Sequence, residues 1–405
     1  MQSGPSLKRS ISLPMLTLYG LGTIIGAGIY VLVGEIAGHA GMYAPLAFLV
    51  AAVVAVFTGV TYGELAARLP FSAGEAVYVN AAFHRKWLSA ITGWAVVLTG
   101  VVSAAALVNG FSGYLLVFVE LPEWWIVVTL TVVLGGIAAW GIKQSAWSAA
   151  IITVLSVLGL VWVLAVAFSS IEISKTDLDD IVPPLTGAAW SGIFIGGFLA
   201  FYAFIGFEDM VNVAEEVHHP ERTIPYAIFI ALGLSTLLYT LVAFAAVFTL
   251  PVDQLQNSRA PLVDMMAAQG EGAEKGIAIL SLLSVVNGAL VQIIMAARVL
   301  YGMARHDMAP SRLGHVSPTT RTPVLATGVT VLVVLAFALW LPIGTLAQIT
   351  SLIVLLVFAV MHLVLLRLKI SNPQPDGVRV ISKAWPAIGL LLTLGLILFR
   401  GVAII

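Results

Sequence analysis

Eleven apolar segments, each long enough to cross a lipid bilayer, dominate the sequence. They cover residues 13–37, 42–69, 88–119, 124–141, 146–168, 190–213, 225–250, 276–303, 323–341, 343–366 and 385–404. A helix needs about 20 apolar residues to cross the hydrocarbon core, where every backbone polar group must find a partner within the protein. Only 10% of the residues are charged, whereas a soluble domain has roughly 25%. The sequence therefore predicts an all-α integral membrane protein with about eleven transmembrane helices.

The Lys and Arg residues indicate how these helices are oriented. If the N-terminus is cytoplasmic, all but four of the 19 Lys and Arg residues lie on the cytoplasmic side; the exceptions are Lys175, Arg259, Lys275 and Arg400. Cytoplasmic loops of membrane proteins carry such an excess of positive charge. We therefore expect a multi-pass protein of the cell (inner or plasma) membrane with a cytoplasmic N-terminus. The odd number of segments would place the C-terminus outside.

The first and sixth segments carry glycines where an unbroken helix would be expected. Four glycines lie between residues 20 and 28, and the sixth segment has glycines in its middle, followed by Glu208 and Asp209. Interrupted helices at corresponding positions of two five-helix halves are typical of transporters with inverted repeats. The free backbone groups at such breaks suit a zwitterion. Its carboxylate would bind N–H groups at one break and its ammonium group carbonyl oxygens at the other.

Several of these features also have a structural interpretation. Gly22 and Gly26 form a GxxxG pattern, which is used in helix packing. Glu208 and Asp209 are functional candidates if they lie at membrane depth, but they face cytoplasmic water if the sixth segment bends early; both interpretations stay open here.

The positions of three further polar residues along the segments predict their surroundings. Glu64 should pair locally near the cytoplasmic interface, and Glu35 should either line an outer vestibule or be solvated. His362 lies toward a cytoplasmic helix end, where snorkelling of the side chain toward water explains it.

Catalysis has little support in the sequence. Cys is absent, no Walker A sequence with its Lys occurs, and no Ser/His, paired Asp or His/Glu constellation shares one membrane depth. We therefore expect no enzymatic activity, no metal site, no cofactor and no nucleic-acid partner.

The motifs together resemble a known family. The stretches that carry the resemblance are residues 22–29 (GTIIGAGI), 62–78 (YGELAARLPFSAGEAVY), 203–225 (AFIGFEDMVNVAEEVHHPERTIP) and 298–305 (RVLYGMAR). Their order and spacing are similar to those of the amino acid–polyamine–organocation (APC) superfamily of transporters, and most similar to its bacterial amino acid permeases. The resemblance implies a LeuT-type fold in one transporter domain (residues 1–405), with inverted repeats at about 11–168 and 188–367 and an extra helix at 385–404.

The resemblance also implies which residues bind the substrate. The carboxylate would meet backbone amides of the first break, and the amino group would meet carbonyls of the second. The implied binding residues are Thr23, Ile25, Gly26, Ala27, Gly28, Ala203, Phe204, Ile205 and Gly206. Candidates for gating or ion coupling are Phe207, Glu208, Asp209, Ser156, Ser281 and Ser284.

Two departures from the family pattern concern the number of helices and the coupling ion. Members usually have twelve spans, whereas we expect eleven here. Some proton-coupled members carry a Lys in helix five, where this chain has Ser156, so a Lys-based proton switch is not expected. Sodium coupling through serine hydroxyls, proton coupling through Glu208 and Asp209, and plain exchange remain open.

We expect a secondary active transporter that moves amino acids by alternating access. No charged residue lies in the first break, which favours a neutral amino acid as substrate. The alternatives are a transporter or exchanger of polyamines or cationic amino acids, with the cation held by Glu208 and Asp209, and a non-transporting sensor or subunit. The expected partners are the small-molecule amino acid and the lipid bilayer.

Overall fold

The computed structural model describes residues 9–26, 28–70, 74–141, 146–170, 181–375 and 377–402, with the backbone alone for residues 146–149. Its α-helices are α1 (Leu13–Ile25), α2 (Gly28–Ala40), α3 (Ala44–Arg68), α4 (Gly74–Phe83), α5 (Lys86–Leu115), α6 (Glu123–Trp140), α7 (Ala146–Ser170), α9 (Gly187–Ala200), α10 (Pro220–Thr249), α11 (Val252–Asn257), α12 (Pro261–Asp264), α13 (Glu271–Arg305), α14 (Val324–Trp340), α15 (Ile343–Ser371) and α16 (Ala384–Val402). Its 3-10 helices are η1 (Gly41–Tyr43), η2 (Phe201–Phe204), η3 (Glu208–Glu216), η4 (Ala267–Gln269) and η5 (Ser311–Gly314).

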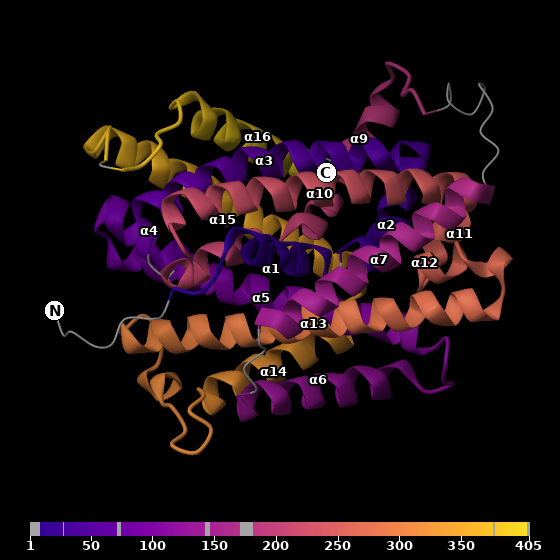
Figure 1. Cartoon of the computed structure of the whole chain (residues 1–405), viewed down its shortest axis with the longest axis horizontal. Helices are drawn as coiled ribbons and strands as arrows, with labels where there is room; N and C mark the ends of the chain where they lie inside the picture. The colour runs from indigo at the N-terminus through magenta and orange to yellow at the C-terminus, as the bar shows by residue number, and fades with distance from the viewer. Residues whose placement is uncertain are drawn as a thin grey trace.

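The expected all-α membrane architecture is confirmed. Nine helical stretches of the described residues are long and apolar enough to cross a membrane, and α1 and α14 are shorter apolar helices. Each of the eleven predicted segments coincides with helical structure: the first is divided between α1 and α2, the sixth among α9, η2 and η3, and each of the others coincides with one α-helix. In Figure 1 the long helices run roughly along the horizontal axis, with α4 near the left end and α11 and α12 near the right end. These three short connecting helices were not expected from the sequence.

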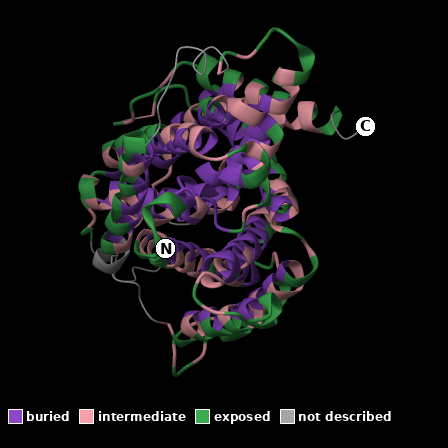
Figure 2. Cartoon of the chain, turned by 90° about the vertical axis from the view of Figure 1, so that its right-hand side faces the viewer, coloured by how far each residue is buried: buried purple, intermediate pink, exposed green. Residues whose placement is uncertain are grey.

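The distribution of buried residues fits a protein surrounded by lipid. Figure 2 looks at the molecule from one end and shows buried residues in the interior and exposed ones around it. Much of the outer surface is apolar: large hydrophobic side chains that are more than two-thirds exposed include Trp140, Leu332, Trp340, Leu391 and Leu398. A soluble protein rarely exposes so many apolar side chains. The surface therefore agrees with a bilayer around the helix bundle.

A buried ionic network joins α3 to α15 at the end of the bundle where α4 lies. Glu64 accepts hydrogen bonds from Arg68 Nε (2.8 Å) and from the backbone N–H of Ile381 (3.0 Å), and its Oε1 lies 2.7 Å from Lys369 Nζ. Lys369 Nζ also donates to the Ile381 carbonyl oxygen (2.6 Å). The side chains of Glu64 and Lys369 are each only 1% exposed. The expected local pairing of Glu64 is confirmed, and its bond to Lys369 adds a tertiary contact.

His362 does not snorkel, and that expectation was wrong. The side chain is completely buried. Its Nδ1 lies 2.9 Å from the Thr61 hydroxyl and its Nε2 lies 3.4 Å from the Thr58 hydroxyl, both on α3. Gly389 on α16 leaves space for the imidazole ring, because a Cβ there would lie 2.7 Å from Nε2. The histidine therefore packs three helices together instead of reaching for water.

Replacement of Glu64 by Gln should destabilise the protein strongly. The change leaves Arg68 and Lys369 without their shared carboxylate, and breaking a buried ion pair in this way costs about 3–5 kcal/mol. We expect a clear fall in the apparent midpoint of thermal unfolding of the purified protein in detergent. The matched control is Glu271→Gln, which removes an exposed carboxylate that pairs with Lys275. Equal midpoints for the two variants would contradict the stabilising role of the network.

Candidate functional site

The first predicted break is present between α1 and α2. The α1 helix ends at Ile25 and α2 begins at Gly28. Gly26 keeps nearly helical dihedral angles (φ −51°, ψ −24°), and Ala27 lies outside the described residues. The first turn of α2 therefore starts inside the bundle, where the N–H groups of a helix N-terminus can bind an anion.

Side chains from other helices satisfy the carbonyl oxygens that this break releases. The Tyr239 hydroxyl on α10 donates to the Ile24 carbonyl oxygen (2.8 Å). The Ser284 hydroxyl on α13 lies 3.4 Å from the carbonyl oxygens of Ile25 and Gly26. Because unpaired backbone groups are costly in a membrane, α10 and α13 stabilise the interruption.

The second predicted break lies at residues 205–206. The α9 helix tightens into the 3-10 helix η2, Ile205 is extended (φ −61°, ψ 138°), and η3 begins at Glu208. Gly206 has φ +123°, a conformation that other residues rarely adopt. The N–H of Gly206 donates to Glu208 Oε2 (2.8 Å). The turn thus fixes one of the two acids that follow it.

The two breaks touch each other through their backbones. A Cβ added to Gly28 would clash with the backbone of Ala203, and one added to Gly206 would lie 2.7 Å from the carbonyl carbon and oxygen of Thr23. The Thr23 hydroxyl also lies 2.9 Å from the Gly206 carbonyl oxygen. These glycines let the interrupted helices approach more closely than any larger residue would allow.

A small cavity of about 20 Å³, the central cavity, lies beside this contact. It is lined by Thr23, Ile24, Gly26, Gly28, Ser103, Leu107, Tyr202, Ile205, Gly288, Val291 and Gln292. The Ser103 hydroxyl donates to the Tyr202 hydroxyl (3.2 Å), which in turn lies 3.1 Å from the Ser103 carbonyl oxygen. The cavity has room for about one water molecule, so a larger solute can enter only when the surrounding helices separate.

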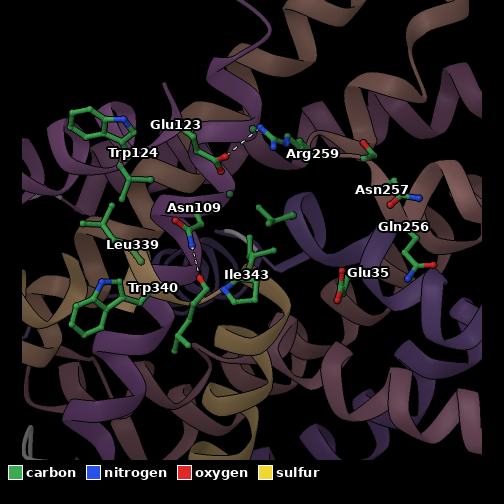
Figure 3. A pocket seen from close by; sticks show the side chains of 18 residues that line it. Glu35, Asn109, Glu123, Trp124, Gln256, Asn257, Arg259, Leu339, Trp340 and Ile343 are labelled. Atoms are coloured by element: carbon green, nitrogen blue, oxygen red, sulfur yellow. Dashed lines mark hydrogen bonds and ion pairs between the residues drawn. The ribbon is translucent and has the colours of Figure 1, made fainter. Parts of the chain in front are cut away.

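A larger cavity of about 660 Å³, the outer vestibule, is lined in part by Gln256 and Asn257 of α11 and by Arg259 (Figure 3). Glu123 and Arg259 form an ion pair across it (3.3 Å), and Asn109 Nδ2 donates to the Leu341 carbonyl oxygen (3.2 Å). Glu35 also lines this cavity. Glu35 therefore lines a vestibule, as the first of its two expectations requires, and the outer position of this vestibule follows from the expected orientation of the chain.

A third cavity of about 30 Å³, the acidic cavity, is lined by Glu75, Glu208 and Asp209 together with neutral residues that include Thr99 and Gln292. Glu208 and Asp209 are each 8% exposed, so they are buried and do not face cytoplasmic water. Glu75 lies on α4, outside the candidate spans, and burial raises the pKa of its carboxyl group, although the Tyr62 hydroxyl donates to Oε1 (3.0 Å).

The three cavities follow one face of α5. From this helix the acidic cavity is lined by Val96, Thr99 and Gly100, the central cavity by Ser103 and Leu107, and the outer vestibule by Asn109, Gly110 and Gly113. Intervals of three and four residues keep most of these positions on one helical face. The stripe extends over about 26 Å at 1.5 Å per residue, close to the thickness of the hydrocarbon core.

The residues expected to bind substrate have different positions around the breaks. Thr23, Gly26, Gly28 and Ile205 line the central cavity. The other described members do not line it: Ile25, Ala203, Phe204 and Gly206 are packed behind it or against the opposite break. Ala27 lies outside the described residues.

The gating and coupling candidates are also separated. Glu208 and Asp209 line the acidic cavity, and Phe207 packs against Tyr62 and Phe358, with ring centroids 5.8 and 5.4 Å apart. The three serines are on α7 and α13 and do not line the acidic cavity. Ser284 contacts the carbonyls of the first break, Ser281 bonds within α13, and Ser156 accepts a hydrogen bond from Tyr30 through its carbonyl oxygen (2.7 Å).

The sequence analysis missed two contributors to the central cavity, the α5 helix and Tyr202. The signal that could have revealed α5 is its row of small residues, Gly100, Ser103, Gly110 and Gly113, at helical spacing. Gln292 is a polar residue in an apolar helix, but its place between two cavities depends on tertiary structure and could not be predicted from the sequence.

Two interrupted helices meet beside the central cavity, and the row of cavities continues from there toward both ends of the bundle. This is the architecture of a secondary transporter. The comparison with known families agrees with this class. The model of the amino acid permease family matches residues 11–405. The chain belongs to this family, and the APC superfamily assignment and the LeuT-type fold expected from the motifs are supported.

The chain is similar to relatives with different named substrates. It is 32% identical over 397 residues to the vacuolar cationic amino acid transporter 2 of Arabidopsis thaliana, covering 92% of this chain and 61% of that protein. It is 28% identical over 430 residues to the branched-chain amino acid permease BcaP of Bacillus subtilis, covering 98% and 89%. An uncharacterized transporter of Mycobacterium tuberculosis is 31% identical over 375 residues, covering 91% and 82%. The chain thus spans less than two thirds of the Arabidopsis protein.

Replacement of Gly28 by Ala should separate the two breaks. The added methyl group would overlap the backbone of Ala203, which cannot rotate away. We expect the variant to lose binding of its amino acid substrate and to have a lower midpoint of thermal unfolding in detergent. Gly233→Ala is the control, because a Cβ at this position in α10 meets nothing within 4 Å. If Gly28→Ala binds ligand as Gly233→Ala does, close contact between the breaks is not required.

Proposed function

We propose that the protein is a secondary transporter, not an enzyme, that moves amino acids across the membrane by alternating access. The observation that carries this proposal is the row of three cavities along α5 with both helix breaks at the middle one. From an amino acid bound in the middle cavity, the other two cavities extend along α5 toward the two sides of the membrane. Membership in the amino acid permease family supports the same substrate class.

The two breaks would recognise the groups that all amino acids share. The α-carboxylate is assigned to the N–H groups at the start of α2, near Gly26 to Gly28, because a helix N-terminus favours negative charge. The α-amino group is assigned to carbonyl oxygens of residues 203–205. This recognition uses only backbone groups, so it does not depend on the substrate side chain.

Alternating access requires parts of the bundle to move against each other. We propose that residues 11–168 and 188–367 form two inverted repeats, a division supported by an interrupted helix near the start of each half. The moving parts are not the repeats themselves, because the paired breaks come from both of them. The proposed location is the plasma membrane with a cytoplasmic N-terminus, supported by the distribution of Lys and Arg.

Purified protein in liposomes should take up at least one labelled amino acid in a saturable manner. The panel contains neutral and cationic amino acids and putrescine, each with imposed sodium or proton gradients to identify the coupling ion. Gly26→Leu should abolish uptake, because a Cβ there already lies 3.2 Å from the Gly288 backbone. Saturable binding without uptake would favour a sensor or subunit, and neither binding nor uptake of any amino acid would refute the proposal.

Cysteine labelling can test the path along α5 directly, since the sequence contains no Cys. Ser103→Cys should react with a water-soluble methanethiosulfonate reagent, and a transported amino acid should slow the reaction. Leu98→Cys is the control. Leu98 lies on the same helix, does not line any of the three cavities, and is 39% exposed on the apolar surface. Equal labelling of the two positions, unaffected by substrate, would argue against a path on this face.

A further inference from the structure

The acidic cavity brings together three carboxyl groups, and the described residues around it supply no cation. Glu208 accepts a hydrogen bond from the Gly206 N–H (2.8 Å), and Glu75 accepts one from the Tyr62 hydroxyl (3.0 Å). Both donors are neutral. None of the ion pairs found among the described residues involves Glu75, Glu208 or Asp209. The cavity wall therefore provides acceptors for a positive charge and no cation of its own in this part of the chain.

Asp209 is an independent indication that a ligand binds here. The residue lines the cavity, is 92% buried, and its Oδ2 has no hydrogen-bond partner among the residues that the structure describes. An ionised carboxylate that is buried without a partner is strongly unfavourable. A cationic donor in the cavity would satisfy Asp209 Oδ2 and would also offset the charge of the two neighbouring acids.

The arrangement suits an organic cation better than a metal ion. The described residues contain no group of three or more His, Cys, Asp or Glu side chains close enough to hold a metal. The volume of about 30 Å³ corresponds to about two water molecules. A primary ammonium group is of this size and has three N–H donors, which allows it to bridge separated acceptors.

Gln292 connects this cavity to the proposed amino acid site, because it lines both the central and the acidic cavity. On α5, Ser103 of the central cavity and Gly100 of the acidic cavity are one helical turn apart, which is about 5 Å. The four-carbon stem of a lysine side chain can bridge that separation.

We propose that the acidic cavity binds the side-chain ammonium group of a lysine-like amino acid whose α-groups lie at the helix breaks. This inference rests on the proposed function and names the substrate class for the same site. The proposal replaces the earlier expectation of a neutral substrate. That expectation was based on the absence of charged residues in the first break, which is the part of the site assigned to the α-groups and not to the side chain.

The test compares L-lysine with L-norleucine, which has the same carbon chain without the ammonium group, and with 6-hydroxynorleucine, which has a neutral polar end. Affinities are measured by calorimetry on the purified protein. We expect wild type to bind lysine at least about tenfold more tightly than either neutral analogue. In Asp209→Asn this preference should fall to about twofold or less, with norleucine binding retained. Glu75→Gln should reduce it in the same direction.

The control variant is Glu271→Gln, which removes an exposed carboxylate far from the cavity in sequence and should keep the preference for lysine. If wild type binds lysine no more tightly than norleucine, the inference is overturned, whatever the variants do. Unchanged preference in both Asp209→Asn and Glu75→Gln would also overturn it. Binding of neutral amino acids without any gain for lysine would leave the proposed function intact, whereas failure of all amino acids to bind would remove both.

Discussion

The structure depends on how backbone polar groups are satisfied where two membrane helices are interrupted. Hydrocarbon offers no hydrogen bonds, so each interruption needs partners from within the protein. The Tyr239 and Ser284 hydroxyls lie against the carbonyls at the end of α1, and Thr23 connects the first break to the Gly206 carbonyl of the second. Each break therefore helps to stabilise the other, and the glycines that cause the breaks also allow their contact.

This pairing explains why the cavities follow α5. The chain is also joined next to α1 and η3, where the backbone of Ile11, before α1, and that of Val217, after η3, form an isolated bridge. The interrupted helices are thus joined to each other at two places. Space for a solute therefore lies between them and the neighbouring helices, not between the two breaks. The α5 helix presents small residues such as Gly100 and Gly110 on that side, which leaves room for a path.

Local sequence patterns predicted the membrane spans and both breaks, because the length of an apolar segment and a cluster of glycines within it determine the structure of that segment alone. They did not predict contacts between distant segments. The pairing of Glu64 with Arg68, four residues away, was expected, but its bond to Lys369 depends on how α15 packs against α3. His362 was misjudged for the same reason, since Thr58 and Thr61 come from another helix. Likewise, no local pattern placed Glu75 beside Glu208 and Asp209.

The nature of the contacts indicates which of them yields when the transporter opens. Gly28 and Ala203 meet through backbone atoms, as do Gly206 and Thr23, and backbone cannot move aside by rotating a side chain. Among the residues that line the outer vestibule, by contrast, the side chain of Val31 packs onto Gly110 of α5. Side-chain contacts of this kind are lost at lower cost and reform in new positions. The two breaks should therefore move as one body, and α5 should separate from them to admit an amino acid.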